Sequence, residues 1–395
     1  MAVSDRLRVL YSFPLRIGAG RICYAAWEQV RGLTEAGADV TLFPASVARP
    51  LPASVVIRPT LARGRFRIPY RILGRENAFR LHDFLVAKRL ERAASSFDIV
   101  HTWPSGARRT LEMANRLGVP TVLERPNSHT ELAYEVVGAE CKRLGISLPP
   151  GSEHAYNSAV LRHEEREFAL AGHLLCPSDF VEQSFLDRGC SPDKILRHTY
   201  GFDQKRFYPD QRRNHDNITM LFAGYAAVRK GLHIALEAWV KSPVSKSGTF
   251  MIAGDILPSY REKLHPWLAH PSVQVLGYRT DIPDLMRSSD LFVLPSFEEG
   301  LPLVCLEAMA SGSVPLVSTA CTELCVHEKN ALVHVPGDVQ ALTEHISLIG
   351  RDRSLLGSLR AEAIDSSRGR TWDYAGRQLV AAYQQALASS TQRVA

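Results

Sequence analysis

The chain has 395 residues, of which 45% are hydrophobic and 22% are charged, and its formal net charge at pH 7 is +6. This length exceeds that at which a single hydrophobic core usually stops growing, so we expect two domains, and the composition excludes an intrinsically disordered chain. The Lys and Arg residues are scattered along the chain, which favours anionic small molecules or an acidic membrane surface as partners over nucleic acid.

The beginning of the chain lacks the basic-then-apolar layout of a signal peptide, and no apolar run approaches the roughly 18 residues that would span a bilayer. Its cysteines are odd in number, dispersed, and without a C-x-x-C pair: Cys23, Cys141, Cys176, Cys190, Cys305, Cys321 and Cys325. We therefore expect reduced thiols in a cytoplasmic protein, with neither a disulfide framework nor a zinc site.

Short apolar runs alternate with longer helical patterns in the first half of the chain, which is typical of a parallel sheet with helical crossovers. Strands are expected at residues 7–13, 38–44, 98–103, 120–125 and 173–178. A helix is expected between the first two strands, because apolar residues recur there at helical spacing up to Gly37.

The second half repeats this alternation. Strands are expected at residues 218–224, 248–254, 273–278, 291–296, 313–318 and 331–335, and helices at 230–241, at 282–290 and from Asp338 to the end. The pattern predicts two doubly wound α/β domains, with a ligand where the carboxyl ends of their strands face each other. The boundary is expected within the polar segment 200–217, and residues 136–159 are expected to form a loop at the cleft.

A basic pair follows the first strand of the second half. Gly224 ends that strand, and Arg229, Lys230 and Gly231 stand just ahead of a strongly helical pattern. A helix start with free N–H groups and two adjacent cations suits a phosphate or pyrophosphate. A solvated basic turn explains the same residues equally well.

Three acidic residues follow the strand expected at 291–296. Glu298 and Glu299 lie in the connecting loop, and Glu307 lies in the first turns of the next helix. The amides of Leu303 and Val304 should point at the same space as the basic pair, because both loops lie at the carboxyl ends of strands in one sheet. Glu307 can then bind a diol such as a ribose, Glu299 the hydroxyls of a second sugar, and Glu298 is expected to be solvated.

Several of these elements resemble the family 4 glycosyltransferases, which are retaining enzymes of the GT-B fold. The resemblance rests on the Glu299 to Glu307 spacing and on "PSFEEGLPLVCLEAMASGSVPLVS", "RKGLHIALEAW" and "YGFDQKRFYP", and it covers nearly the whole chain. It implies two facing Rossmann-like domains with a cleft between them. Residues 1–200 would bind the acceptor and 201–375 the nucleotide sugar, and a helix at 376–395 could return to the first domain.

The resemblance also implies roles for the site residues. Arg229 and Lys230 would neutralise the diphosphate with help from the amides of Leu303 and Val304. Glu307 would bind the ribose and Glu299 the transferred sugar. Tyr278 and Arg279 would border the nucleobase.

One position departs from the family. Many members have an Arg directly after the glycine that ends the first strand of the second domain, where this chain has Tyr225. Whether Arg229 supplies that charge stays open.

The first domain offers weaker signals. Gly18 and Gly20 precede a helix, which allows either a tight turn or a loop that closes over the donor diphosphate or the acceptor. His101 is expected to be a structural hydrogen-bonding residue. His129 is divided between a structural role and a catalytic one, because related enzymes often carry a histidine after this strand, close to the reacting sugar.

The resemblance thus implies a hexosyltransferase that moves a sugar from a UDP or GDP donor to an acceptor hydroxyl with retention, in polysaccharide, glycolipid or glycoconjugate synthesis. Glu299, Lys230 and His129 are the predicted catalytic residues, and the leaving diphosphate would take the acceptor proton. No Asp-x-Asp motif ends a strand of the first domain, so a metal-independent reaction is expected. The nucleotide sugar is expected as a co-substrate, and no other cofactor is expected.

Other functions fit a pair of facing Rossmann-like domains. A nucleotide-sugar epimerase would lack the Glu-x7-Glu context, a glycogen-type phosphorylase would need a longer chain, and a non-catalytic sugar-binding protein gains weight from Tyr225.

The acceptor can be a sugar, a lipid-linked sugar or a small molecule, and nucleic acid is not expected. The Arg-rich segment 61–80 could touch an anionic membrane, which would place the protein at the inner face, or could be a solvated connection.

Overall fold

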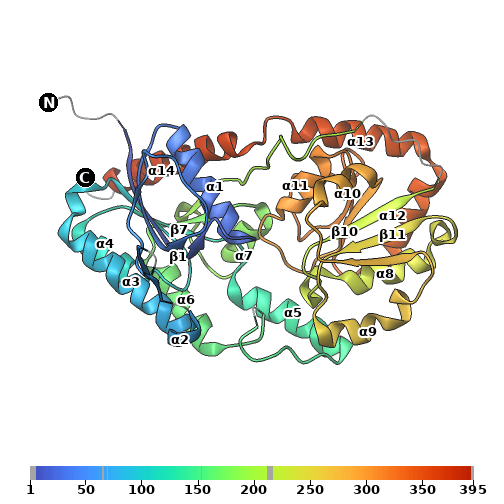
Figure 1. Cartoon of the computed structure of the whole chain (residues 1–395), viewed down its shortest axis with the longest axis horizontal. Helices are drawn as coiled ribbons and strands as arrows, with labels where there is room; N and C mark the ends of the chain where they lie inside the picture. Colours follow the sequence, from blue (N-terminus) through green and yellow to red (C-terminus); the bar gives the residue numbers. More distant parts are fainter. Residues whose placement is uncertain (1–5, 65, 69, 153, 211–216, 393–395) are drawn as a thin grey trace.

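The computed structural model describes residues 6–64, 66–68, 70–152, 154–210 and 217–392. These residues form two α/β bodies that lie side by side along the long axis of the molecule, the N-terminal one in blue to green and the C-terminal one in yellow to red (Figure 1). Each body is built on its own parallel sheet, as the sequence predicts.

The N-terminal sheet has, in the described chain, seven parallel strands in the order β3-β2-β1-β6-β7-β8-β9. The strands are β1 (Arg8–Ile17), β2 (Asp39–Val47), β3 (Val56–Ile57), β6 (Ile99–Thr102), β7 (Thr121–Glu124), β8 (His173–Cys176) and β9 (Ile195–Arg197). The helices are α1 (Ile22–Glu35), α2 (Tyr70–Leu73), α3 (Arg75–Arg92), α4 (Arg108–Leu117), α5 (Thr130–Leu144), α6 (Ser158–Leu170) and α7 (Asp179–Leu186), with 3-10 turns η1 (Ala94–Ser96) and η2 (Pro192–Lys194). A separate antiparallel hairpin joins β4 (Ala62–Arg63) to β5 (Phe66–Arg67).

The C-terminal sheet has, among the described residues, six parallel strands in the order β12-β11-β10-β13-β14-β15. They are β10 (Thr219–Ala223), β11 (Thr249–Ala253), β12 (Val273–Gly277), β13 (Leu291–Leu294), β14 (Val314–Ser318) and β15 (Leu332–His334). The helices are α8 (Leu232–Lys241), α9 (Pro258–Leu268), α10 (Ile282–Ser288), α11 (Leu303–Ala310), α12 (Val339–Arg351), α13 (Arg353–Ser367) and α14 (Trp372–Gln392), with 3-10 turns η3 (Val228–Lys230) and η4 (Pro243–Lys246).

The central strands explain why the sequence pattern is readable. Every residue of β6, β7, β8, β13 and β14 is buried, because helices cover both faces of a parallel sheet. Such strands appear in the sequence as short continuous apolar runs, and every predicted strand is confirmed.

The structure corrects the sequence prediction in a few places. The short edge strands β3 and β9 and the β4–β5 hairpin were not predicted, since two or three residues carry no periodicity. Residues 136–144, expected as part of a loop, are the second half of α5. The described part of the loop comprises residues 145–152 and 154–157, and residues 211–216 of the expected boundary segment lie outside the described residues.

Two helices tie the bodies together. Helix α14 crosses back and packs on the N-terminal body, where Leu379, Ala382 and Tyr383 join its core (Figure 1). Helix α5 leaves the N-terminal body and buries Val137 and Cys141 in the core of the C-terminal one. None of the described helices combines the length and the apolar content that crossing a membrane requires.

Candidate active site

The basic pair lies where α8 begins, beside the end of β13. Gly231 has φ +64°, and a Cβ built on it would lie 2.1 Å from the carbonyl oxygen of Pro295. Only glycine tolerates both the positive φ and this contact. The amide of Phe297 also donates to the carbonyl oxygen of Arg229 at 2.8 Å, so η3 and the loop after β13 form one unit.

Glu299 is paired with both cations. Its carboxylate lies 2.9 Å from Lys230 Nζ and 2.8 Å from an Arg229 guanidinium nitrogen, and Ser296 Oγ donates to it at 3.0 Å. Burial alone would raise the pKa of Glu299, but Arg229 and Lys230 outweigh it and lower the pKa to about 2. The three residues expected to meet at the donor are therefore in contact.

Glu298 differs from the expectation of a solvated side chain, which is wrong. The residue is fully buried, and its carboxylate accepts hydrogen bonds from the amide (3.0 Å) and hydroxyl (2.8 Å) of Ser128 in the N-terminal body. His154 Nε2 lies 3.5 Å away. Burial would raise the pKa of Glu298, whereas His154 and Arg229 lower it, and the net pKa is below its usual range.

The same loop touches the N-terminal body again at Gly300. A Cβ on Gly300 would lie 1.6 Å from the carbonyl oxygen of Pro126, and Ser178 Oγ donates to the Gly300 carbonyl at 2.5 Å. The carboxyl ends of the two sheets therefore meet at the acidic loop, as the doubly wound pattern predicts.

Helix α11 provides the other side of this space. It begins at Leu303, so the amides of Leu303 and Val304 belong to its first turn and have no acceptor within the helix. Glu307 lies farther along the same helix and is half-buried. Burial raises its pKa to about 7, an effect that Arg206 opposes and Asp203 reinforces.

The glycine-rich loop after β1 faces the loop after β10. Gly18 has φ +78°, and a Cβ there would lie 3.0 Å from that of Arg49, whereas nothing lies within 4 Å of a Cβ on Gly20. Arg21 also has a positive φ of 60°, which is uncommon for a residue with a side chain. Its guanidinium carbon lies over the ring of Tyr225, 5.4 Å from the centroid.

His129 lies at the start of α5, in the N-terminal body. It caps α5, with Nδ1 accepting from the amide of Glu131 at 3.2 Å, and its ring stands between those of Phe168 and Phe185, with centroids 5.2 and 5.0 Å away. Burial, reinforced by Arg125, lowers its pKa to about 4, so the ring is neutral near pH 7.

His101 is a buried structural residue, in agreement with the sequence prediction. Its Nδ1 lies 2.7 Å from the Tyr383 hydroxyl on α14, and burial lowers its pKa to about 3. Its Nε2 faces Glu124, which also holds the Tyr200 hydroxyl at 2.6 Å. This network joins the N-terminal sheet to the returning helix and to the connection between the bodies.

Arg279 stands at the carboxyl end of the edge strand β12, exposed and paired with Asp281 at 2.8 Å. Arg279 therefore lies at the carboxyl edge of the sheet, two strands away from β10. Within the part of the chain that the structure describes, no three His, Cys, Asp or Glu side chains are grouped so that they could hold a metal ion.

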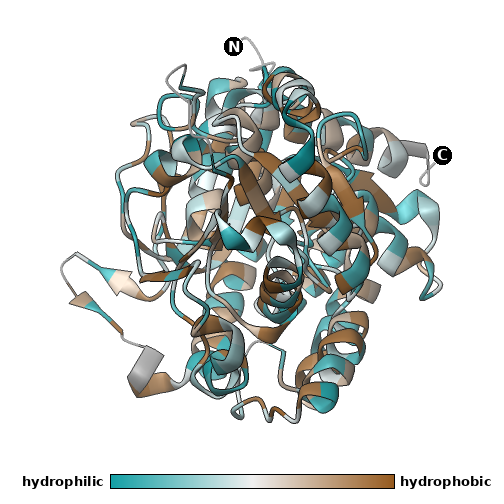
Figure 2. Cartoon of the chain, turned by 90° about the vertical axis from the view of Figure 1, so that its right-hand side faces the viewer, coloured by the Kyte–Doolittle hydropathy of each residue, from teal (hydrophilic) through white to brown (hydrophobic). Residues whose placement is uncertain are grey.

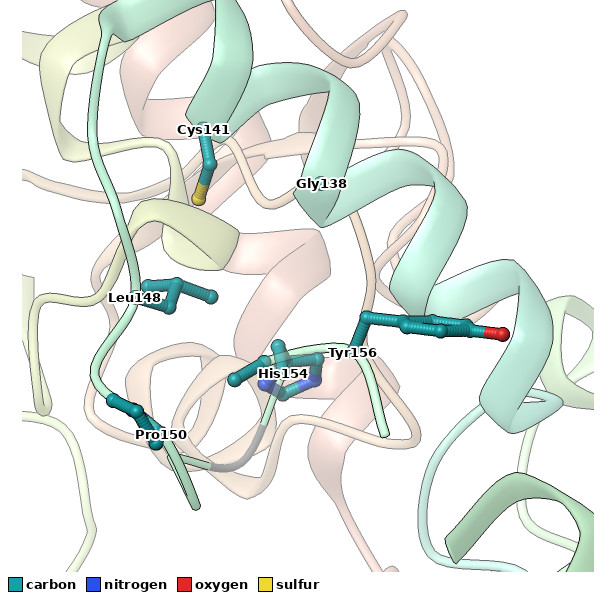
Figure 3. A pocket seen from close by; sticks show the side chains of 7 residues that line it. Gly138, Cys141, Leu148, Pro150, His154 and Tyr156 are labelled. Carbon is teal, nitrogen blue, oxygen red and sulfur yellow. The ribbon is translucent and has the colours of Figure 1, made fainter. Parts of the chain in front are cut away.

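A pocket of about 370 Å³ lies between α5 and the loop 145–157, next to Glu298 through His154 (Figure 3). It is lined by Gly138, Cys141, Leu148, Pro150, His154, Ala155 and Tyr156. The mixture of apolar groups with one imidazole and one phenol suits a ligand with both apolar and hydroxyl-bearing parts.

Sequence reasoning missed three contributors to the site: the buried Glu298, His154 and Arg21. Only Arg21 had a usable signal, because a long cation follows a Gly-x-Gly turn at a helix start. The partners of Glu298 come from segments more than 140 residues away, and no local pattern reports them.

Two family models match this chain. A family model described as Glycosyltransferase Family 4 matches residues 24–205, and one described as Glycosyl transferases group 1 matches residues 217–352. The chain is 26% identical to D-inositol 3-phosphate glycosyltransferase 1 of Catenulispora acidiphila, over 93% of this chain and 91% of that protein.

Two further similarities are informative. The chain is 46% identical to the UDP-Gal:alpha-D-GlcNAc-diphosphoundecaprenol alpha-1,3-galactosyltransferase of Escherichia coli, over 56% of this chain and 58% of that one. It superposes on sucrose-phosphate synthase from Thermosynechococcus elongatus with a TM-score of 0.71 at 17% identity, over 98% and 100% of the two chains. The matched models and the shared architecture show that the chain belongs to the family 4 glycosyltransferases and has their GT-B fold.

Proposed function

We propose that this glycosyltransferase moves a hexose from UDP to an acceptor hydroxyl with retention of configuration. The observation that carries the proposal is the contact of Arg229 and Lys230 with Glu299 at the carboxyl end of the second sheet. UDP is preferred over GDP because the relative from Escherichia coli is named for a UDP-sugar donor.

In this proposal the diphosphate lies between the two bodies. Lys230 reaches it from η3, the amides of Leu303 and Val304 from α11, and Arg21 from the loop that also contains Gly18 and Gly20. Arg21, beside Tyr225, supplies the positive charge that many family members have at the position of Tyr225. Arg229 has a positioning role instead, because its guanidinium donates to the Glu298 carbonyl at 2.6 Å and holds the acidic loop in place.

The sugars are bound by carboxylates. Glu299 keeps Lys230 in place before the donor arrives and then accepts hydrogen bonds from the transferred sugar. Glu307, when its carboxylate is ionised, accepts hydrogen bonds from the hydroxyls of the ribose. Arg279 borders the nucleobase from the end of β12.

The transfer step follows from these positions. The bond between the sugar and the diphosphate breaks and its electron pair stays with the diphosphate, while the acceptor oxygen bonds to the same face of the sugar. The acceptor proton passes to the departing diphosphate oxygen. Lys230, Arg21 and the start of α11 stabilise the charge that develops there.

His129 has a positioning part. Its Nδ1 is used by the α5 cap and its ring is enclosed by two phenyl rings, so it fixes the turn that presents Ser128 to Glu298. We do not propose that His129 contacts the sugar directly.

The acceptor binds to residues 1–200, with the pocket beside His154 receiving part of it, and the nucleotide sugar binds to residues 201–375. The relative from Escherichia coli is named for a diphosphoundecaprenol acceptor, which supports a lipid-linked acceptor and a cytoplasmic site at the inner face of the membrane. A transfer to such an acceptor would be a step in the synthesis of a surface polysaccharide or a glycolipid.

The test is release of UDP from a panel of UDP-sugars, measured with and without a lipid-linked sugar acceptor. Stoichiometric release that requires the acceptor supports transfer. Interconversion of donors without release would indicate an epimerase, and binding without turnover a non-catalytic protein.

A further inference from the structure

Three exposed apolar side chains of the N-terminal body lie close together in sequence, on the β4–β5 hairpin, on α2 and between the two, and two of them are the most exposed among the described residues of that body. The exposed fractions are 85% for Phe66, 75% for Ile72 and 44% for Ile68. Single exposed apolar residues are ordinary, but three within seven positions are a patch that calls for a partner. We call the described residues between Arg58 and Arg80 the basic hairpin.

The charge around this patch has one sign. Residues 58–80 contain seven arginines and a single acidic residue, Glu76. Glu76 is already paired with Arg80. Arg63, Arg67 and Arg75 are exposed on the same segment as Phe66, so the partner must be anionic as well as apolar.

The start of the basic hairpin runs alongside β2 towards the carboxyl end of that strand. The amides of Arg58, Thr60 and Leu61 donate to the carbonyl groups of Leu42, Pro44 and Ala45 in turn. The hairpin therefore leaves the sheet at the edge that faces the C-terminal body. In Figure 2 it projects at the lower left, clear of the two bodies, with brown and teal residues side by side.

We propose that the basic hairpin docks the protein on an anionic lipid bilayer. Phe66, Ile68 and Ile72 enter the interfacial region, and Arg63, Arg67 and Arg75 pair with lipid phosphates. Docking at this edge would bring a membrane-held acceptor to the cleft. That purpose rests on the proposed function, but the lipid binding itself does not.

A bilayer fits this surface better than a nucleic acid or a protein does. Aliphatic side chains such as Ile72 bury no apolar surface against a phosphate backbone. Their transfer from water to the acyl boundary of a bilayer is favourable in free energy. A small convex projection offers little complementary area to a folded partner, while a fluid bilayer closes around it.

Flotation of the full-length protein with vesicles tests the proposal with no sugar donor present. We expect binding to vesicles of phosphatidylcholine with phosphatidylglycerol, loss of binding at high salt, and little binding to phosphatidylcholine alone. The double variant Arg63→Gln/Arg67→Gln should bind about thirtyfold more weakly, since each arginine near an anionic surface contributes roughly a factor of five.

A matched control removes the same charge elsewhere. Arg261 and Arg351 are exposed on the C-terminal body, and Arg261→Gln/Arg351→Gln should bind vesicles like the wild type. The apolar variant Phe66→Ser/Ile72→Ser should also weaken binding, whereas Tyr278→Ser, at a position 76% exposed in the other body, should not.

Equal binding by the Arg63/Arg67 variant and its control would overturn the proposal, as would unchanged binding of Phe66→Ser/Ile72→Ser. Calorimetry with UDP separates the two proposals, because hairpin variants should retain wild-type affinity for UDP. Vesicle binding without UDP binding would refute the proposed donor and leave the docking surface standing.

Discussion

The guanidinium of Arg21 lies over the ring of Tyr225, 5.4 Å from its centroid. The two residues belong to different bodies, one following β1 and the other following β10. Arg21 also adopts a positive φ, a conformation that costs free energy and is retained mostly where function requires it. The contact brings an N-terminal cation to the loop that carries Lys230.

Replacing Arg21 by Ala should weaken UDP-sugar binding about tenfold, because a hydrogen bond to a charged group is worth roughly 1.5 kcal/mol or more. Calorimetric titration measures the change. Tyr225→Phe retains the aromatic ring and should bind normally. Unaltered affinity in Arg21→Ala would remove Arg21 from the donor site.

Replacing Gly300 by Ala should disrupt the junction between the bodies. The new methyl group would lie 1.6 Å from the Pro126 carbonyl oxygen, so the loops must separate. We expect a loss of stability of about 1–3 kcal/mol in urea unfolding and a large loss of turnover.

Gly357→Ala is the matched control for that variant, because nothing lies within 4 Å of a Cβ at this helical position. It should be neutral or slightly stabilising. If Gly300→Ala behaved like Gly357→Ala in both assays, the close contact between the two bodies would not be needed for activity.

Donor affinity should depend on pH through Glu307. Burial raises its pKa to about 7, so the ionised form that accepts ribose hydrogen bonds is present above pH 7 and is lost as the pH falls through that value. Between pH 8 and pH 6 the ionised fraction falls about tenfold, and the Kd for UDP should rise by up to that factor.

Glu307→Gln does not titrate, so its Kd for UDP should be higher and should vary over the same range only through the terminal phosphate of UDP itself. Arg206 and Asp203 lie near Glu307, and their charges act on its pKa in opposite directions. A wild-type Kd that is flat over this pH range, or one that worsens as pH rises, would show that the ionised carboxylate is not the binding form.

Filling the pocket beside α5 should affect the acceptor and leave the donor alone. Leu148 lines this pocket, and Leu148→Trp places a larger side chain in a space of about 370 Å³. The KM for the acceptor should rise several-fold with an unchanged Kd for UDP. Leu117→Trp, at an exposed end of α4, is the control, and equal acceptor KM values for the two variants would place the acceptor elsewhere.

The sequence allowed the two-sheet architecture and the meeting of Arg229, Lys230 and Glu299 to be predicted, because both depend on local patterns. Buried central strands such as β13 are continuous apolar runs, and the loop after each one contributes to the same sheet edge. Arg229, Lys230 and Glu299 could therefore be brought together from their positions alone.

The contacts between the bodies could not be predicted in the same way. Glu298 is buried because Ser128 and His154 reach it from the other body, and a charged residue in a loop is otherwise expected to be solvated. Similarly, the packing of His129 against Phe168 and Phe185 depends on α6 and α7, which are distant in sequence.

The central claim is that Lys230 and its ion pair with Glu299 form the donor site. Lys230→Ala, confirmed as folded by its circular dichroism spectrum, should be titrated calorimetrically with UDP-, GDP-, ADP- and TDP-sugars beside the wild type. We expect the wild type to bind a UDP-sugar and Lys230→Ala to bind it about a hundredfold more weakly, as the loss of a charge-assisted contact of ~3 kcal/mol requires. Equal affinity of the folded variant and the wild type would contradict the account.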